Sequence, residues 1–334
     1  MNSFFKIFII LFMFIGIIGL SLFLHIIKFA DIPLDLSANN KIFYVKSGQS
    51  LYTISKNLQH ENLIKDNGLF RNFANIKGYS NQVKAGEFVL CACMSPKKIL
   101  EIFVKGKTKL HKLTIPEGYN LKQTALEIEK KGFGTKQDFI FLSKNKKFIK
   151  KMGINADSIE GYLFPETYFF EKNEPLKNII IKMIKRFNIV FTKKWKKKAK
   201  KMGFSVHEIV ILASIIEKET GSEPERPLIS SVFHNRLKKG MRLESDPTVI
   251  YGISDYNGNI TKKHLITKTS YNTYKIKGLP LGPIANPGAK SLKAALFPAN
   301  TDYLFFVSKK DKTHKFSKNI WDHNKAVKKY QLNH

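Results

Sequence analysis

The stretch 207–252 reads HEIVILASIIEKETGSEPERPLISSVFHNRLKKGMRLESDPTVIYG. The spacing of its apolar residues predicts two helices, over about 207–220 and 225–239, each followed by a glycine. The first helix is apolar and ends with two carboxylates, Glu217 and Glu219. Burial at such a position raises the pKa of a carboxyl group, so the group stays protonated and can donate to a leaving oxygen. The stretch therefore holds two candidates for the acid of an acid/base site.

Only one of the two carboxylates can face a given groove. At 3.6 residues per turn their side chains project about 160° apart. Glu219 lies on the larger apolar stripe of the predicted helix, which Leu212, Ile215 and Ile216 form. The pattern favours Glu219 over Glu217 as the acid. For either residue, the alternative is an exposed glutamate at a helix end.

The composition of the chain indicates a protein of several modules with a strong positive charge. Its 334 residues are enough for two or three modules, and 43% of them are hydrophobic. Only five of the 57 basic residues are arginines, although the net charge is +31. Specific nucleic-acid readers rely on the planar fork of arginine, so we expect no nucleic-acid partner. We interpret the lysines as solvated faces, with weak attraction to anionic wall polymer or lipid headgroups as the alternative.

Residues 7–27, IFIILFMFIGIIGLSLFLHII, are predicted to be a transmembrane signal anchor. These 21 residues contain no Asp, Glu, Lys or Arg, and a helix of this length spans about 31 Å, the thickness of a bilayer core. No small-x-small cleavage site follows them, so a cleaved signal peptide is the alternative. Lys6 gives a slight bias toward a cytoplasmic N-terminus over residues 1–6. We expect a single-pass protein.

Residues 28–41 are polar and rich in turn formers, which predicts a linker. The next module, 42–108, opens with IFYVKSGQSLYTISKNL, a β-rich run, a Ser-Gly turn and a helical spacing. A strand over 84–90 and a helix over 96–104 follow in the prediction. The opening resembles that of a LysM module, a small β/α fold that binds N-acetylglucosamine-containing glycans. A purely structural β/α element is the alternative.

The two cysteines, Cys91 and Cys93, would point to the same face if they lie on a strand. Two cysteines cannot make a disulfide framework, and no histidine pair at zinc-ligand spacing accompanies them. We interpret them as small apolar strand residues. No metal site and no cofactor are predicted.

Residues 109–334 are predicted to form a larger α+β catalytic domain, so the whole chain combines a transmembrane helix, a LysM-like β/α module and an α+β domain. The loop EGYLFPETY is aromatic and holds Glu160 and Glu166. Aromatic faces with nearby polar groups are typical of carbohydrate sites, which makes Glu166 a candidate substrate contact; an ordinary packed loop is the alternative. The very basic helix expected over 174–202 is interpreted as a solvated face, with membrane-surface contact as the alternative.

Motifs over nearly the whole chain follow one another in an order that resembles one family. They are ASIIEKET (213–220), ER (225–226), VFHNRL (232–237), GMRL (240–243), DPTVIYG (246–252), YNTY (271–274), GLP (278–280), NPG (286–288), SLKAA (291–295) and YLFFV (303–307). The chain is identified on these motifs as similar to the endolytic murein transglycosylases, the MltG (YceG-like) family. The resemblance implies that the essential acid is the second glutamate of the Glu-Lys-Glu-Thr motif, which is Glu219 here.

The family reaction implied by the resemblance uses one carboxyl group twice. Glu219 would protonate the oxygen that links MurNAc to GlcNAc, and the resulting carboxylate would take the proton of the C6 hydroxyl of the same sugar. That oxygen would close onto C1 and leave a 1,6-anhydro end, so the paired carboxylates of ordinary glycosidases are not required. The expected partners are peptidoglycan glycan strands, the inner membrane and peptidoglycan synthases. Because the substrate lies outside the inner (cytoplasmic) membrane, the catalytic domain is expected in the periplasm.

Five further residues are expected to contact sugar or to orient Glu219: Asn235, Asp246, Tyr271, Asn272 and Tyr274. Bracing of the loops is the alternative for each of them. We expect Arg236 to form a structural ion pair with Glu225 or Asp246. Two other functions stay open, namely a non-catalytic wall-binding scaffold and a water-using muramidase with Asp246 as its second carboxylate.

Overall fold

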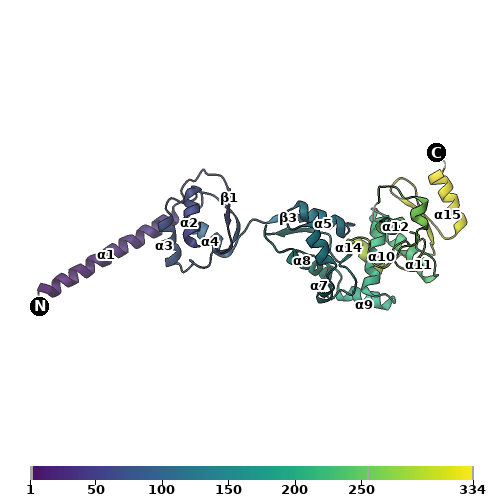
Figure 1. Ribbon diagram of the computed structural model, residues 1–334, viewed down its shortest axis with the longest axis horizontal. Helices are drawn as coiled ribbons and strands as arrows, with labels where there is room; N and C mark the ends of the chain where they lie inside the picture. Colours follow the sequence, from purple (N-terminus) through teal and green to yellow (C-terminus); the bar gives the residue numbers. More distant parts are fainter. Residues whose placement is uncertain (1–2, 254–255, 333–334) are drawn as a thin grey trace. The chain divides into compact units, whose positions relative to one another are not determined.

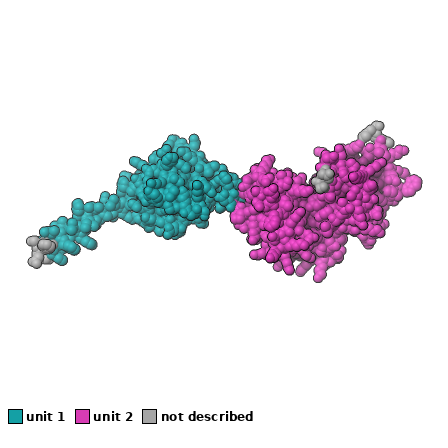
Figure 2. Space-filling model, viewed as in Figure 1, with its two compact units in different colours: residues 1–111, 169–173 teal, residues 112–168, 174–334 magenta. Residues whose placement is uncertain are grey.

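The computed structural model describes residues 3–253 and 256–332, which fold into two compact units (Figures 1 and 2). Unit 1 consists of residues 1–111 and 169–173, and unit 2 consists of residues 112–168 and 174–334. The predicted combination of an N-terminal apolar helix with mixed helices and strands is confirmed.

The elements of unit 1 begin with a long helix and continue with an alternation of short strands and helices. They are α1 (Ser3–Asp31), β1 (Lys41–Val45), α2 (Leu51–His60), α3 (Asn67–Ile76), β2 (Gly86–Leu90) and α4 (Pro96–Lys105). The strands β3 (His111–Thr114) and β4 (Thr167–Phe170) pair with each other where the chain passes between the units.

Unit 2 is mostly helical. Its helices are α5 (Leu121–Lys130), α6 (Lys136–Ser143), α7 (Lys146–Lys151), α8 (Leu176–Val190), α9 (Lys193–Lys201), α10 (Val206–Glu219), α11 (Arg226–Lys238), α12 (Asp246–Tyr251), α13 (Lys262–Ile266), α14 (Ala289–Leu296) and α15 (Ile320–Val327). A 3-10 turn (Glu223–Glu225) precedes α11, a π-helical turn (Lys328–Leu332) follows α15, and β5 (Phe305–Ser308) pairs antiparallel with β6 (His314–Ser317).

Helix α1 is long and apolar enough to cross a membrane over Phe5–Asp31, by length and composition. It continues through Asp31, past the predicted end of the span at residue 27. The reason is packing, because Ile26 and Ala30 are buried in the core of unit 1 and keep the last turns helical. The first residues of the predicted linker, 28–41, are therefore part of a docked helix rather than a free connection.

Unit 1 is built in the order β-α-α-β, with one further helix after the second strand. Strands β1 and β2 form an antiparallel ladder in which Lys41 pairs with Leu90 and Val45 with Gly86. A two-stranded sheet is marginal by itself, so the helices must cover it to give a stable core. Phe43, Phe88 and Phe103 are fully buried there, with ring centroids 4.8 and 5.8 Å apart around Phe103.

The interpretation of Cys91 and Cys93 as strand residues is wrong. Strand β2 ends at Leu90, and the two cysteines lie in the following turn, where they form a disulfide. Alternate residues of a strand are about 6.6 Å apart, whereas the turn brings the two Cα atoms to 5.0 Å, within the range that a disulfide spans. Ala92 between them accepts a hydrogen bond from the backbone N–H of Leu34 (3.0 Å), which pairs the turn with the segment after α1.

Helix α10 is the centre of unit 2, with α11, α12 and α14 packed against it (Figure 1). Every residue from Ile209 to Ile216 is buried, which is typical of a helix surrounded on all sides. Ser205 and Glu208 form a capping box at its start. The two helices predicted over 207–220 and 225–239 correspond to α10 and α11.

The basic helix predicted over 174–202 is two helices, α8 and α9, with the break at Phe191 and Thr192. The hydroxyl of Thr192 accepts a hydrogen bond from the backbone N–H of Trp195 (3.3 Å) and so begins a new helix.

Candidate active site

The C-terminal end of α10 opens into a cavity of about 430 Å³ in unit 2. The described residues that line it are Glu219, Arg236, Leu243, Glu244, Asp246, Tyr274, Phe306, Val307, Ser308, His314, His323, Val327 and Gln331. They come from α10, α11, the turn before α12, the start of α12, the loop after α13, the β5–β6 hairpin, α15 and the π-helical turn after it. Carboxyl, guanidinium, phenol and imidazole groups therefore converge on one cavity with a mostly polar lining, which suits a polar ligand.

Glu219 is the last residue of α10, and its surroundings shift the pKa of its carboxyl group in both directions. Burial at the end of the apolar helix is the largest of them and raises the pKa of Glu219 to about 7. The nearby Asp246 carboxylate raises it as well, whereas the Ser245 hydroxyl, which donates a hydrogen bond to Oε1, and the Arg236 guanidinium lower it. Near neutral pH both the protonated and the ionised forms of Glu219 are populated.

The turn that carries Ser245 has an uncommon backbone conformation. Glu244, just before it, has a φ of 53°, in the left-handed region that side-chain-bearing residues avoid. Hydrogen bonds from Ser245 N to Thr273 Oγ1 (3.0 Å) and between the hydroxyls of Thr248 and Thr273 (2.8 Å) hold the turn in place. Such a conformation persists only where its surroundings enforce it, and here it brings Ser245 to Glu219 and Asp246 to the cavity.

Asp246 and Tyr274 form a pair beside Glu219. The phenol of Tyr274 donates to Asp246 Oδ1 at 2.7 Å. Burial and the neighbouring carboxylates raise the pKa of Tyr274, so its hydroxyl stays protonated and acts as a donor. The motifs Asp-Pro-Thr and Tyr-Asn-Thr-Tyr thus meet at the cavity through one hydrogen bond.

The expectation that Arg236 pairs with Glu225 or Asp246 is wrong. Arg236 is buried, and its Nη1 contacts Glu244 Oε2 at 2.9 Å. Nη1 also donates to the carbonyls of Arg242 and Leu243, and Nε donates to that of Leu304 (2.7 Å), so acceptors from two loops hold the guanidinium. Glu225 binds His314 instead, at 2.7 Å.

Glu217 lies in a different environment from Glu219. Its Oε1 forms an ion pair with Arg226 at 3.2 Å, and both side chains are less than a tenth exposed. Its Oε2 accepts the backbone N–H of Gly288, the residue before α14, at 2.9 Å. The first glutamate of the motif therefore connects α10 with α11 and α14, whereas Glu219 lines the cavity.

Four residues expected at the site are not among the described residues that line this cavity, and each makes bracing contacts. The amide of Asn235 donates to the carbonyls of Thr301 and Tyr303, and the buried amide of Asn272 donates to those of His264, Leu265 and Thr267. The ring of Tyr271 packs on that of Tyr251 (4.8 Å), and Glu166 is ion-paired with Arg186 (2.6 Å). A sugar contact for any of them stays a prediction.

The sequence reasoning missed Glu244, His314 and His323 as cavity residues, and Ser245 as the hydrogen-bond donor to Glu219. The sequence could have pointed to Ser245, since it lies directly before the Asp-Pro-Thr motif. The two histidines had no such local signal, because only the β5–β6 hairpin and α15 bring them to the end of α10.

A second buried carboxyl group, Glu160, lies at the other end of α12. Both oxygens of Glu160 are within 3.1 Å of the backbone N–H of Leu121, and Oε2 accepts the phenol of Tyr251 (2.9 Å). Burial raises the pKa of Glu160 to about 7. Since Tyr251 is the last residue of α12 and Asp246 the first, this contact fixes the helix that supports the cavity wall.

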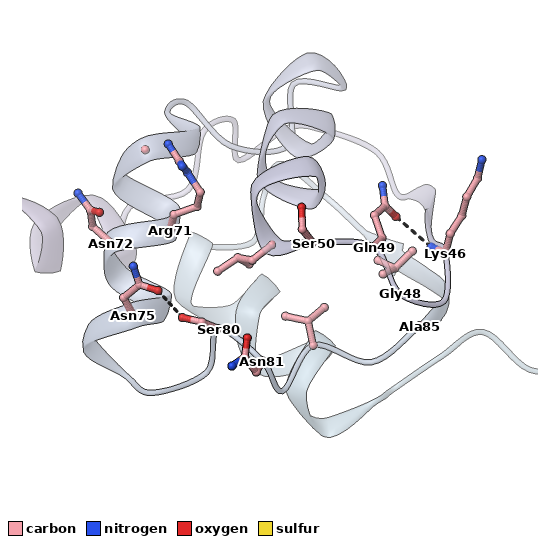
Figure 3. Close-up of a pocket in the computed structure, with 14 residues that line it drawn as sticks. Lys46, Gly48, Gln49, Ser50, Arg71, Asn72, Asn75, Ser80, Asn81 and Ala85 are labelled. Atoms are coloured by element: carbon pink, nitrogen blue, oxygen red, sulfur yellow. Dashed lines mark hydrogen bonds between the residues drawn. The ribbon is translucent and has the colours of Figure 1, made fainter.

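Unit 1 contains a separate hollow of about 630 Å³ with a polar lining. Figure 3 shows Arg71, Asn72 and Asn75 from α3 around it, with Gln49 from the loop before α2 and Asn81 from the loop after α3. Amide and guanidinium groups offer both donors and acceptors, which suits a polar ligand. Among the residues that the structure describes, no group of three or more His, Cys, Asp or Glu could hold a metal ion.

Comparisons with known proteins agree on one family. A family model described as the YceG-like family matches residues 43–329. A curated protein of Bacillus subtilis (strain 168), named endolytic murein transglycosylase, is 36% identical over 86% of this chain and 83% of its own length. A protein of the same name from Streptococcus pneumoniae (strain ATCC BAA-255 / R6) is 28% identical over 83% of this chain, which spans 56% of that relative. A solved yceG-like protein from Listeria monocytogenes is similar with a TM-score of 0.61 and 34% identity, over 86% of this chain and 98% of that chain.

Proposed function

The chain belongs to the YceG-like family, and from this membership and the environment of Glu219 we propose that it is an endolytic murein transglycosylase. It cleaves the bond between MurNAc and GlcNAc within peptidoglycan glycan strands. Each cleavage leaves a 1,6-anhydro-MurNAc end, and cleavage within nascent strands limits their elongation. This is the reaction of a lyase, because no water is added across the broken bond.

Glu219 supplies both proton transfers. In its protonated form it donates to the glycosidic oxygen, which leaves with the bonding electrons while positive charge develops at C1 of MurNAc. The carboxylate that remains takes the proton of the C6 hydroxyl of the same sugar, and the C6 oxygen bonds to C1. The hydrogen bond from Ser245 stabilises the ionised form between the two transfers.

The observation that carries the proposal is the pKa of about 7 at Glu219, in a cavity at the end of a buried helix. A group that must act first as an acid and then as a base works best when its pKa lies near the working pH. A carboxyl with an ordinary pKa would be almost fully ionised at neutral pH and would seldom be able to begin the reaction.

Cleavage of purified glycan strands in ¹⁸O-labelled water tests the proposal. Mass spectrometry should find anhydro ends without the heavy isotope. Reducing ends that carry ¹⁸O would show a water-using muramidase, for which Asp246 in the same cavity is the second carboxylate. Intact strands would show a non-catalytic wall-binding scaffold.

The membrane placement follows from the substrate. We propose that α1 is an uncleaved anchor in the inner (cytoplasmic) membrane, with residues 1–6 in the cytoplasm and both units in the periplasm, where glycan strands are assembled. An enzyme that acts on nascent strands has to meet them near the peptidoglycan synthases, which are proposed as its protein partners. A reporter fused after His334 should be active only outside the cytoplasm, and a cytoplasmic signal would refute this topology.

For unit 1 we propose glycan binding. Its β-α-α-β order and the LysM-like sequence at residues 42–58 support this role, as does the polar hollow beside α3. No acid comparable to Glu219 is among the described residues that line the hollow. Unit 1 is therefore proposed to hold the strand, while unit 2 cleaves it.

A further inference from the structure

Two imidazole rings line the Glu219 cavity, and the reaction described above uses neither of them. His314 lies at the start of β6 and His323 in α15. Both come from the C-terminal part of the chain, far in sequence from the Glu-Lys-Glu-Thr motif. Their position in the same cavity as the acid raises the question of what they bind.

Glu225 holds His314 by two hydrogen bonds. The backbone N–H of His314 donates to Glu225 Oε1 (2.8 Å), and the ring nitrogen Nδ1 lies 2.7 Å from Oε2. Both side chains are only 12% exposed. The ring of Phe306 packs edge-to-face on the imidazole with centroids 5.5 Å apart, so the orientation of the ring is fixed on two sides.

The contact with Glu225 sets the hydrogen-bonding character of the opposite nitrogen. A carboxylate only accepts hydrogen bonds, so Nδ1 of His314 must carry the proton. In the neutral ring, Nε2 then has a free lone pair and accepts hydrogen bonds. Nε2 has no hydrogen-bond partner among the described residues, although the ring lines the cavity.

His323 lines the same cavity from α15. Its Nδ1 is buried and has no hydrogen-bond partner among the described residues. Its ring stacks on Phe305 with centroids 5.1 Å apart. Because this buried atom is out of reach of a ligand in the cavity, His314 rather than His323 offers an open ring nitrogen there.

We propose that His314 is a substrate-binding residue of the active site, positioned by Glu225, which accepts a hydrogen bond from the saccharide at Nε2. The ligand class is an N-acetylated glycan, whose hydroxyl and acetamido N–H groups are the donors that such an acceptor needs. The inference rests on the proposed function and adds a contact to the same cavity. Glu225 does not touch the saccharide and acts through the orientation of the imidazole ring.

The test uses binding rather than turnover. In full-length protein carrying Glu219→Gln, which holds substrate without cleaving it, affinity for a GlcNAc–MurNAc oligosaccharide is measured by calorimetry. His314→Asn keeps a donor near the Nδ1 position for Glu225 but removes Nε2. It should weaken binding about tenfold, which corresponds to one lost hydrogen bond of about 1.4 kcal/mol. His314→Gln places an amide group near the Nε2 position and should bind within about threefold of the parent.

The matched pair separates recognition from folding. Thermal melting of His314→Asn, which keeps a donor for Glu225, should stay close to that of the parent. If the parent binds and His314→Asn binds equally well, the inference is wrong and the proposed function stands. If both variants lose affinity together with thermal stability, the role of His314 is structural and the inference is also wrong. If the parent itself binds no oligosaccharide, the proposed function fails and the inference fails with it.

Discussion

Replacing Glu217 by glutamine should damage the fold rather than the chemistry. Glu217 precedes the acid by two residues in the same motif and would serve, on sequence grounds, as the harmless control for Glu219. In the structure Glu217 has a structural role, because its carboxylate neutralises the buried Arg226 and accepts a hydrogen bond from the backbone N–H of Gly288. Glutamine keeps the size and one acceptor oxygen but removes the negative charge.

The size of the effect follows from burial. The Glu217 and Arg226 side chains are 6% and 8% exposed, so water cannot replace the lost partner. Breaking a buried ion pair by removing one charge costs about 3–5 kcal/mol. Because glutamine can still accept the Gly288 N–H, we expect the lower end, about 3 kcal/mol. For a domain of 150–250 residues this corresponds to a fall in Tm of roughly 6–12 °C.

Calorimetry of the detergent-solubilised full chain measures this shift, with Glu219→Gln as the matched variant. Glu219→Gln removes a carboxyl that is costly to ionise in its cavity and should leave the melting transition of unit 2 nearly unchanged. Below its melting temperature, Glu217→Gln should still produce anhydro ends. An unchanged Tm for Glu217→Gln would refute the assignment of the ion pair as a structural contact.

Three further predictions concern the acid, the second buried carboxyl and unit 1. Ser245→Ala removes a hydrogen bond that stabilises ionised Glu219, so the pKa of Glu219 should rise by about one unit. Since the first step needs the protonated acid, the alkaline limb of the pH–kcat profile should move to higher pH. An alkaline limb at the same pH would count against this contact. Glu160 has a folded-state pKa of about 7 against an ordinary 4.5, so the native state binds more protons between these values and stability should fall by about 3 kcal/mol as pH rises from 4.5 through 7. Glu160→Gln should make this fall smaller, and melting curves at pH 5 and 8 that change equally in both proteins would contradict the prediction. Arg71→Ala together with Asn75→Ala should weaken glycan binding in a pull-down with purified strands while the product keeps its anhydro end, and a change of product type would show that unit 1 takes part in the chemistry.

Local patterns of apolar residues predicted the helices well. The limits of α10 and α11 differ by about one residue from those predicted. The apolar run Ile209–Ile216 is visible in the sequence itself, and all of it is buried in α10. The break between α8 and α9 was missed, although Thr192 has the side chain of an N-cap. The lysines scattered through α8 and the lysine run of α9 gave the whole stretch one basic character that hid the boundary.

Contacts between distant segments were beyond local reasoning. Arg236 could have paired with any of several acids, and the left-handed turn at Glu244 decides the outcome. His314 reaches the cavity only through the β5–β6 hairpin, so no spacing near the acid could reveal it. In contrast, Asp246 and Tyr274 lie in motifs that were singled out, and the structure places both beside Glu219.

The most direct test of Glu219 as the single acid/base is the rate at which the Glu219→Gln variant forms anhydro-MurNAc ends. Glutamine keeps the size of the side chain but can neither donate nor recover the proton. Mass spectrometry of glycan strands incubated with the full-length variant should show a loss of at least about 10²–10⁴-fold relative to the unmodified chain, with thermal melting preserved. A folded Glu219→Gln variant that still forms anhydro ends within tenfold of the original rate would contradict the account.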